Sequence, residues 1–331
     1  MKTSNHTPQF ESIFANYLKN FLLFKISLGY KYKSERNILA RFDKFCKTED
    51  VNTLELTENI ILKWASKRAS ESHKTHSIRN TVLRQFCIYL NNNGIPVILS
   101  AQIKKNKCLK VFKPYIFTYE QISNLIFQAD KMGEERSSSI SYVVIPVILR
   151  ILYGCGLRVS EVLALKISDI DLKHGIITVK DSKFGNSRLV PISKSLKTVL
   201  IDYFKNVHSV SEDKDIVFPT SKNTQYNTAA IYLKFRELLW QCKISHGGRG
   251  KGPRVHDLRH TFAVHTLQKW IKKNQDTFLL LPILSVYLGH KNIYSTEKYL
   301  RLTSEMYLDT LKKVKNICNN VIPEVIDYET Y

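Results

Sequence analysis

The chain has 331 residues, more than one ordinary small core requires, so its length favours two domains of unequal size. It carries 50 Lys and Arg against 29 Asp and Glu, and the formal charge of +21 far exceeds the ~2 to 8 charges that solubility alone requires. The excess is spread along the chain, which favours a polyanionic partner and makes nucleic acid the first hypothesis.

Composition also argues against several other classes of protein. The six cysteines are scattered and form no CxxC pair, so neither a zinc site nor a disulfide framework is predicted. The longest apolar runs, residues 143–153 and 278–288, are too short to span a bilayer. Residues 1–20 lack the apolar core of a signal peptide. We therefore expect a soluble, cytoplasmic protein with no membrane partner.

Helical periodicity dominates the first part of the chain. A stripe of apolar residues over 14–24 predicts one amphipathic helix, and further helices are expected over 34–46, 57–69 and 77–90. Thr57 is a natural N-cap for the third of these helices. The basic residues of this bundle are interpreted as solvated: Lys31, Lys33, Arg36, Lys67, Arg68, Lys74, Arg79 and Arg84.

Five lysines then follow within ten residues, before Pro114: Lys104, Lys105, Lys107, Lys110 and Lys113. A run of this kind is typical of a charged interdomain linker, which can lie along a phosphate backbone. It is equally compatible with a hinge that binds no ligand.

The sequence after the linker contains both helical and extended segments. Thr118 to Gln121 have the signature of a helix start. A β-branched run over 175–179 and an extended run over 187–192 flank the turn Phe184-Gly185-Asn186, which predicts a β-hairpin. Helices are expected over 118–132, 142–153, 159–165, 196–204, 228–239, 257–272, 278–288 and 304–317.

Candidate residues for phosphodiester chemistry occur in this second part. Cleavage without a metal needs cations for two non-bridging oxygens, an acid for the leaving oxygen and a positioned nucleophile. Arg158 follows a glycine-containing turn, and Glu161 lies one helical turn later. A guanidinium fixed there could grip a phosphate through two hydrogen bonds. Taken alone, such an arginine is more commonly a structural salt-bridge partner.

The segment HDLRHTFAVH places His256 and Arg259 one helical turn apart, so their side chains leave the same face. The loop before it is rich in glycine and positive charge, and Arg249 and Lys251 are candidate DNA contacts. His260 and His265 are interpreted as helix-packing or surface residues.

A third segment, YLGHKNIYSTEKYL, ends an apolar helix at Leu288-Gly289. His290 follows, and Tyr299 comes nine residues later after a short polar stretch. Because the chain has 17 tyrosines, any one of them is by default a core or surface residue.

Three motifs occur in one order along the chain: GCGLRVSEVLALKISDIDL, HDLRHTFA and LGHKNIYSTEKY. In this order and spacing the chain resembles the tyrosine recombinases, which include the phage integrases, the Xer resolution enzymes and Cre. The resemblance covers roughly residues 115–315 in specific motifs, and the basic helical region before them in general character.

The resemblance implies a mainly α fold with a small β-sheet. An N-terminal helical core-binding (SAM-like) domain and a mixed α/β catalytic domain would form a C-shaped DNA clamp. On this basis we expect a DNA-binding domain over 1–103, a basic linker over 104–115, a catalytic domain over 116–317 and an acidic tail over 318–331. The segment 268–282 is longer than the family usually shows. The helix over 304–317 would dock on a neighbouring protomer or pack within its own domain.

The three motifs assign catalytic roles to individual residues. The resemblance implies that Arg158 and Arg259 are the catalytic arginines, His256 and His290 the catalytic histidines, and Tyr299 the nucleophile, with Glu161 as the usual acidic neighbour of Arg158.

The family's catalytic lysine lies in the hairpin turn, where Lys183 is our choice. Phe184 and Ser187 depart from the turn more often seen in the family, and Lys180 on the preceding strand remains a competitor.

The implied function is site-specific recombination or integration of double-stranded DNA, as in mobile elements. It would proceed through a 3′-phosphotyrosyl intermediate and a Holliday junction, with no cofactor and no metal. The implied assembly is a dimer on each site and a tetramer in the synapse, or a hetero-oligomer with related recombinases. A type IB topoisomerase-like relaxing enzyme and a noncatalytic DNA-binding regulator are the alternatives.

Overall fold

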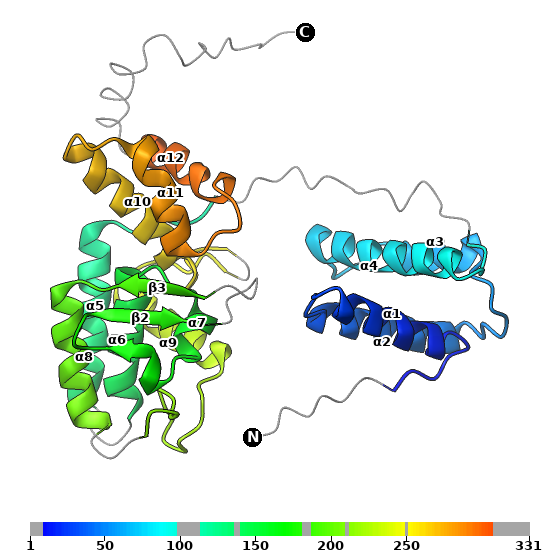
Figure 1. The fold of residues 1–331 in the computed structure, drawn as a ribbon, viewed down its shortest axis with the longest axis horizontal. Helices are drawn as coiled ribbons and strands as arrows, with labels where there is room; N and C mark the ends of the chain where they lie inside the picture. Colours follow the sequence, from blue (N-terminus) through cyan, green and yellow to red (C-terminus); the bar gives the residue numbers. More distant parts are fainter. Residues whose placement is uncertain are drawn as a thin grey trace, which may run out of the picture. The chain divides into compact units, whose positions relative to one another are not determined.

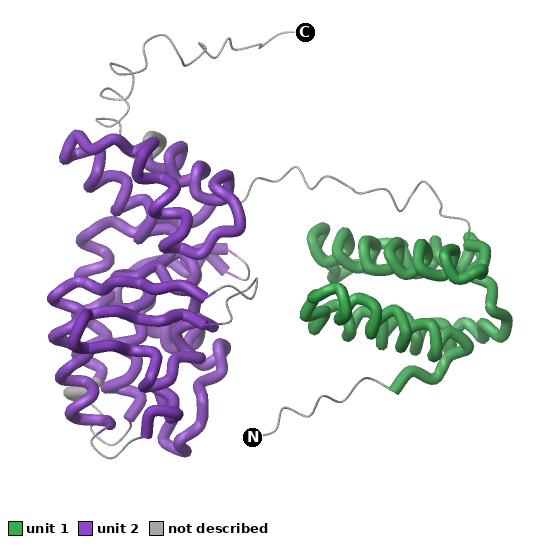
Figure 2. The backbone as a smooth tube through the Cα atoms, viewed as in Figure 1, with its two compact units in different colours: residues 1–112 green, residues 113–331 purple. Residues whose placement is uncertain are grey.

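The computed structural model describes residues 9–97, 113–135, 140–180, 187–208, 212–248 and 251–306. The chain divides into two compact units, residues 1–112 and 113–331 (Figure 2). In its described residues the first unit is helical, and the second packs a small sheet against helices (Figure 1). The prediction of a mainly α protein with a small sheet is confirmed.

The first unit contains α1 (Ala15–Ser27), α2 (Lys33–Thr48), α3 (Glu58–Ala65) and α4 (His73–Asn92). Their apolar faces meet in one core, where the ring of Phe86 packs against Phe21 and Phe42 at centroid distances of 5.5 and 6.0 Å. Thr57 caps α3, as predicted, because its side chain accepts a hydrogen bond from the amide of Ile60. The periodic apolar stripes therefore specified this bundle correctly.

Arg79, which we expected at the solvated surface, is instead buried. Its Nη2 donates to Glu71 Oε2 at 2.8 Å and its Nε to Oε1 at 2.9 Å. The same guanidinium donates to the carbonyl oxygens of Trp64 and Ser66. These carbonyls end α3, so Arg79 ties that end to α4, and its hydrogen bond lowers the pKa of Glu71 to about 2.

The second unit is built around α6, with a three-stranded antiparallel sheet in the order β1-β2-β3. Val179 pairs with Arg188 across the predicted hairpin, whose turn, residues 181–186, lies outside the described residues. The elements in chain order are α5 (Tyr119–Glu135), α6 (Ser141–Gly154), α7 (Val159–Leu163), η2 (Ile167–Asp169), β1 (Ile170–Asp171), β2 (Ile176–Val179), β3 (Arg188–Pro191), α8 (Lys194–Val207), α9 (Thr228–Gln241), α10 (Asp257–Lys272), α11 (Thr277–Leu288) and α12 (Tyr294–Met306).

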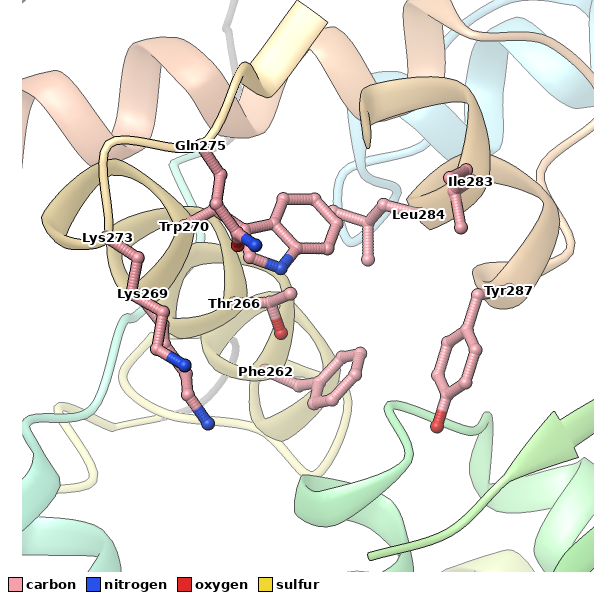
Figure 3. A pocket seen from close by; sticks show the side chains of 9 residues that line it. All are labelled: Phe262, Thr266, Lys269, Trp270, Lys273, Gln275, Ile283, Leu284 and Tyr287. Atoms are coloured by element: carbon pink, nitrogen blue, oxygen red, sulfur yellow. The ribbon is translucent and has the colours of Figure 1, made fainter. Parts of the chain in front are cut away.

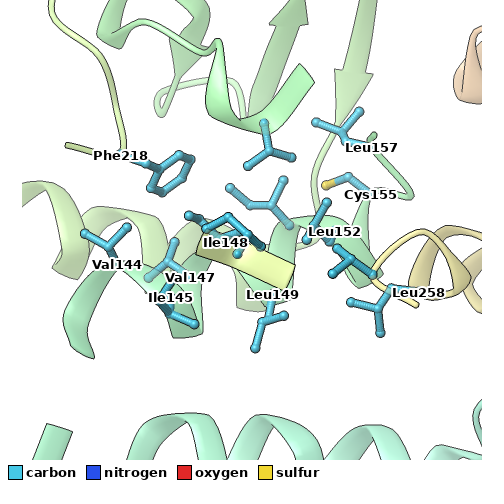
Figure 4. Close-up of a cluster of buried hydrophobic side chains, with 14 of the residues drawn as sticks. Val144, Ile145, Val147, Ile148, Leu149, Leu152, Cys155, Leu157, Phe218 and Leu258 are labelled. Atoms are coloured by element: carbon cyan, nitrogen blue, oxygen red, sulfur yellow. The ribbon is translucent and has the colours of Figure 1, made fainter. Parts of the chain in front are cut away.

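Helix α6 is apolar on nearly every side because other elements surround it. It packs against α5, α8 and α10, and Figure 4 shows its side chains meeting Phe218 and Leu258, which come from distant parts of the chain. The helix contains Pro146 and ends at Gly154, just before the loop that leads to Arg158. The position of that loop is thus set by the core of the unit.

Helices α10, α11 and α12 contact one another and share a separate apolar cluster, to which Tyr299 belongs. Tyr299 lies on α12, which begins at Tyr294, so the second half of the short polar stretch before Tyr299 is helical. Of the helix predicted over 304–317, residues 304–306 end α12 and the others lie outside the described residues.

The long segment 268–282 forms the end of α10, a turn and the first half of α11. It borders a hollow of about 480 Å³, where Phe262 and Trp270 of α10 face Ile283 and Tyr287 of α11 (Figure 3). None of the predicted site residues lines this hollow. Across the described residues, the helices fall short of the length and apolar character that a membrane crossing requires.

Candidate active site

Arg158 occupies the N-cap position of α7, immediately after the loop that leaves α6. Its Nη1 donates to Glu161 Oε1 at 2.6 Å, and its backbone N–H donates to Oε2 at 2.9 Å. Its Nη2 donates to the carbonyl oxygen of Gly289 at 3.2 Å. The guanidinium is therefore oriented from two sides, by α7 and by the end of α11.

Glu161 is shared between Arg158 and Arg188, a residue of β3 that the sequence analysis did not select. The two Nη atoms of Arg188 donate to Glu161 at 3.1 and 2.9 Å, and its Nε donates to the carbonyl oxygen of Tyr287 at 2.8 Å. Burial alone would raise the pKa of Glu161, but the hydrogen bonds from Arg188 and Arg158 lower it to about 2. The carboxylate is therefore ionised at neutral pH.

Arg259 is almost completely buried, with 1% of its surface exposed. Its Nη1 donates to the carbonyl oxygen of Gly156 at 2.7 Å and its Nη2 to that of Leu288 at 2.5 Å. Gly156 has φ +60°, and a Cβ there would lie 2.5 Å from the ring of Phe262. This close approach of backbone and ring requires glycine. Burial lowers the pKa of Arg259 to about 10, so it remains a cation at neutral pH.

The three histidines of the second motif have different surroundings. His256 occupies the N-cap position of α10 without a capping hydrogen bond from its side chain, and burial, with the nearby Arg259, lowers its pKa to about 4. His265 packs as expected, because its ring stacks on Tyr119 at 3.9 Å. His260 does not merely pack: its Nδ1 lies 2.8 Å from the hydroxyl oxygen of Tyr299. The interpretation of His260 as a helix-packing or surface residue was incomplete, since the third motif meets the second only in the folded chain.

Tyr299 differs from the neighbouring tyrosines. It is 1% exposed, whereas Tyr294 is 76% exposed and the hydroxyl of Tyr287 donates to the carbonyl oxygen of Pro191. Burial raises the pKa of Tyr299 to about 12, against the opposing effect of Arg259 and Arg158. Its hydroxyl is therefore protonated at neutral pH.

His290 lies against Tyr299. Their ring centroids are 6.2 Å apart, with the planes inclined by 23°. Its Nδ1 lies 2.6 Å from Thr296 Oγ1, a contact that fixes the orientation of the ring. Burial, and then the positive charge of Arg259 and Arg158, lowers the pKa of His290 to about 3. The imidazole is therefore neutral and can donate one hydrogen bond.

A hollow of about 340 Å³ joins these side chains. Its described lining contains four arginines and lysines and no carboxylate, so it suits an anion. The lining includes Lys291 and Lys298, which the sequence analysis did not select although they flank His290 and Tyr299. The full lining is Arg158, His256, Arg259, His260, His290, Lys291, Asn292, Ser295, Lys298 and Tyr299.

Only some of the basic residues that the sequence analysis selected lie within the described residues. Lys183, Lys104, Lys105, Lys107, Lys110 and Arg249 lie outside the described residues, whereas Lys113 and Lys251 lie within them. Lys180, the competitor of Lys183, contacts Asp169 Oδ1 at 2.6 Å through its Nζ. No cluster of three or more His, Cys, Asp or Glu side chains among the described residues could hold a metal ion.

The mainly helical second unit, with a tyrosine hydroxyl in a cationic hollow, defines a class of enzyme, the tyrosine recombinases. The sequence profile of the phage integrase family matches residues 116–306, and the chain belongs to that family.

Several relatives match most of the chain. The integrase/recombinase y4rB of Sinorhizobium fredii is 29% identical over 313 residues, which cover 92% of this chain and 98% of the relative. The tyrosine recombinase XerA of Pyrococcus horikoshii is 26% identical over 259 residues, which cover 77% of this chain and 80% of the relative.

Solved structures share the fold. The Tn1549 transposon integrase in complex with transposon right end DNA has a TM-score of 0.63 at 15% identity and covers 92% of this chain and 99% of its own. The XerH recombinase bound to its difH substrate has a TM-score of 0.57 at 20% identity, with coverages of 79% and 73%. The chain is thus a recombinase in both family and fold, and it acts in site-specific DNA recombination.

Proposed function

We propose that this recombinase cuts and rejoins double-stranded DNA through a 3′-phosphotyrosyl bond on Tyr299 and a Holliday junction. The observation that carries the proposal is the hollow that joins the Tyr299 hydroxyl to Arg158 and Arg259. A scissile phosphate in this hollow would meet a nucleophile and two guanidinium groups at once.

Arg158 and Arg259 would bind the two non-bridging oxygens of the phosphate, and His290 would add a hydrogen bond. Both guanidinium groups are already held by backbone carbonyls, at Gly289 for Arg158 and at Gly156 and Leu288 for Arg259. Donors that are oriented in advance stabilise developing charge without reorganising during the reaction. The arrangement therefore suits the pentavalent transition state better than a flexible cationic surface would.

The proposed chemistry conserves the bond energy. The phenolic oxygen of Tyr299 attacks phosphorus, the bond from phosphorus to the 5′ oxygen breaks, and Lys183 protonates that oxygen. A 5′ hydroxyl of a partner strand then attacks the phosphotyrosyl bond and releases the tyrosine. With a pKa of about 12, Tyr299 needs a base at neutral pH, and the family resemblance assigns this role to His256. The scheme itself consumes no cofactor.

We also propose the partners. Double-stranded DNA would be held by both units, with the basic linker along the backbone, and the protein would form a dimer on each site and a tetramer in the synapse. A lambda integrase structure of the same fold, with a TM-score of 0.59, is described as a dimer bound to a core site. The net charge of +21 supports a nucleic-acid partner.

The test is to trap the covalent complex. Wild-type protein is incubated with nicked duplexes of randomised sequence, adducts resistant to SDS are isolated, and the DNA ends are sequenced. Tyr299→Phe should bind DNA as wild type does and form no adduct, because it lacks the attacking oxygen.

Tyr294→Phe is the matched control, since Tyr294 is exposed and lies on the same helix. It should form the adduct at the wild-type rate. An adduct that survives Tyr299→Phe and disappears in Tyr294→Phe would contradict the proposal. Relaxation of any supercoiled plasmid, whatever its sequence, would favour the topoisomerase alternative.

A further inference from the structure

His260 is the imidazole nearest to the reacting oxygen of Tyr299 in the described structure. Its Nδ1 lies 2.8 Å from that oxygen, and the two ring centroids are 5.6 Å apart. His256 packs its ring against His260 at 4.8 Å and forms no hydrogen bond to Tyr299 among the described contacts. His256, which the family resemblance assigns as the base, therefore contacts the ring of His260 rather than the hydroxyl of Tyr299.

The surroundings of His260 keep its ring neutral at neutral pH. Burial is the largest effect, and the neighbouring groups add to it: His256 and Arg259 on α10, Lys298 on α12, and Arg254 just before α10. Together they lower the pKa of His260 to about 3. A neutral imidazole has one nitrogen that can accept a proton, whereas both nitrogens of an imidazolium already carry one. His260 can therefore act as a base.

We propose that His260 is a further catalytic residue, whose Nδ1 accepts the hydroxyl proton of Tyr299 as its oxygen attacks phosphorus. The inference rests on the proposed role of Tyr299 as nucleophile. In the forward step the O–H bond of Tyr299 breaks and its proton moves to His260, while the tyrosine oxygen bonds to phosphorus and the bond from phosphorus to the 5′ oxygen breaks. In the reverse step the phosphotyrosyl bond breaks and His260 returns the proton to the tyrosine.

Bound DNA would make this transfer favourable. A phosphodiester in the hollow places a negative charge beside Arg158 and Arg259, and Arg259 is one of the cations that suppress protonation of His260. Offsetting that charge raises the affinity of His260 for a proton. The nucleophile would thus be activated when the phosphate is in place, and it would remain a protonated phenol otherwise.

The test compares His260→Asn with His265→Asn, a histidine of the same helix that does not line the hollow. Asparagine can keep a polar atom near the Nδ1 position, but it cannot take up a proton at neutral pH. Covalent complex formation is measured in single turnover, on the nicked duplex that wild-type protein selects, with DNA binding measured in parallel. His260→Asn should bind DNA normally and react about 100-fold or more slowly, within the usual range for loss of a general base. His265→Asn, whose ring stacks on Tyr119 and does not line the hollow, should react at close to the wild-type rate.

A second measurement separates proton transfer from positioning. Trifluorotyrosine at position 299 is more acidic than tyrosine and depends less on a base. It should accelerate His260→Asn at least about tenfold relative to its effect in the wild-type background. Equal acceleration in both backgrounds, or a His260→Asn rate within about threefold of wild type, would overturn the inference. Either result would contradict the role of His260 without contradicting the proposed role of Tyr299. The role of Tyr299 is contradicted if Tyr299→Phe still forms the adduct.

Discussion

At the scale of single residues, Lys180 and Lys183 are the two candidates for the general acid. Lys180 directly follows β2, which ends at Val179, and its Nζ lies 2.6 Å from Oδ1 of the buried Asp169. Lys180 would have to break its ion pair with Asp169 before its ammonium group could protonate a leaving oxygen. Lys183 belongs to the predicted hairpin turn, which lies outside the described residues, and we propose it as the acid.

Replacing the scissile 5′ oxygen by sulfur tests this choice, because a thiolate leaves without a proton. Lys183→Ala should cleave an ordinary phosphodiester about 100-fold or more slowly than wild type and recover most of the rate on the sulfur substrate. Arg158→Ala should not recover, since its defect is in charge stabilisation. Rescue of Lys180→Ala instead of Lys183→Ala would assign the acid to Lys180. Single-turnover cleavage rates provide the measurement.

At the scale of elements, one carboxylate connects three parts of the catalytic unit. Glu161 of α7 binds Arg188 of β3, which in turn holds the carbonyl oxygen of Tyr287 on α11. The side chain of Glu161 is 5% exposed and that of Arg188 8%, so the pair is largely shielded from water. Removing one partner of a buried pair leaves an uncompensated charge, which is strongly destabilising.

We therefore expect Glu161→Gln to lower the free energy of unfolding at pH 7 by about 3 to 5 kcal/mol. The folded-state pKa of about 2 lies below the ordinary 4.5, so this stabilisation is present above pH 4.5. It is lost as the pH falls from 4.5 toward 2, and the two stability curves should converge there. Urea unfolding across that pH range measures the difference.

Glu212→Gln is the matched control. Glu212 pairs with Lys214 at 2.7 Å, but both side chains are mostly exposed, and exposed pairs contribute little. Its stability should stay close to wild type at every pH. A Glu161→Gln curve parallel to that of wild type down to pH 2 would show that the carboxylate does not carry this stability.

At the scale of the whole molecule, the charge of +21 should make DNA binding strongly dependent on salt. Each phosphate contact adds a slope of about −0.9 to the plot of log K against log salt on B-DNA, because counterions are released. We expect a steep slope for the full chain in a fluorescence anisotropy titration. A chain with Lys104, Lys105, Lys107 and Lys110 changed to glutamine should show a shallower one. An affinity that hardly changes with salt would contradict the proposal that both units and the basic linker hold the DNA backbone.

Much of the fold could be predicted because its determinants are local. The helix predicted over 257–272 is α10 without any change of boundary, and the antiparallel hairpin forms between the two predicted extended runs. Five catalytic candidates within the described residues, Arg158, His256, Arg259, His290 and Tyr299, line one hollow. Their motif spacing placed them correctly together, although no spacing states which atoms touch.

The sequence by itself determined most of the helices, the two paired strands, the family, and four of the residues that line the hollow with Tyr299, namely Arg158, His256, Arg259 and His290. These follow from periodicity, turn residues and motifs within short segments. Only the tertiary structure decided that Arg79 is buried, that Arg188 shares Glu161 with Arg158, and that His260 meets the hydroxyl of Tyr299. Each of these contacts joins side chains from separate elements, 27 positions apart for Arg188 and Glu161 and 39 for His260 and Tyr299. Such contacts depend on how helices and strands pack, and packing is a property of the whole core rather than of any local pattern.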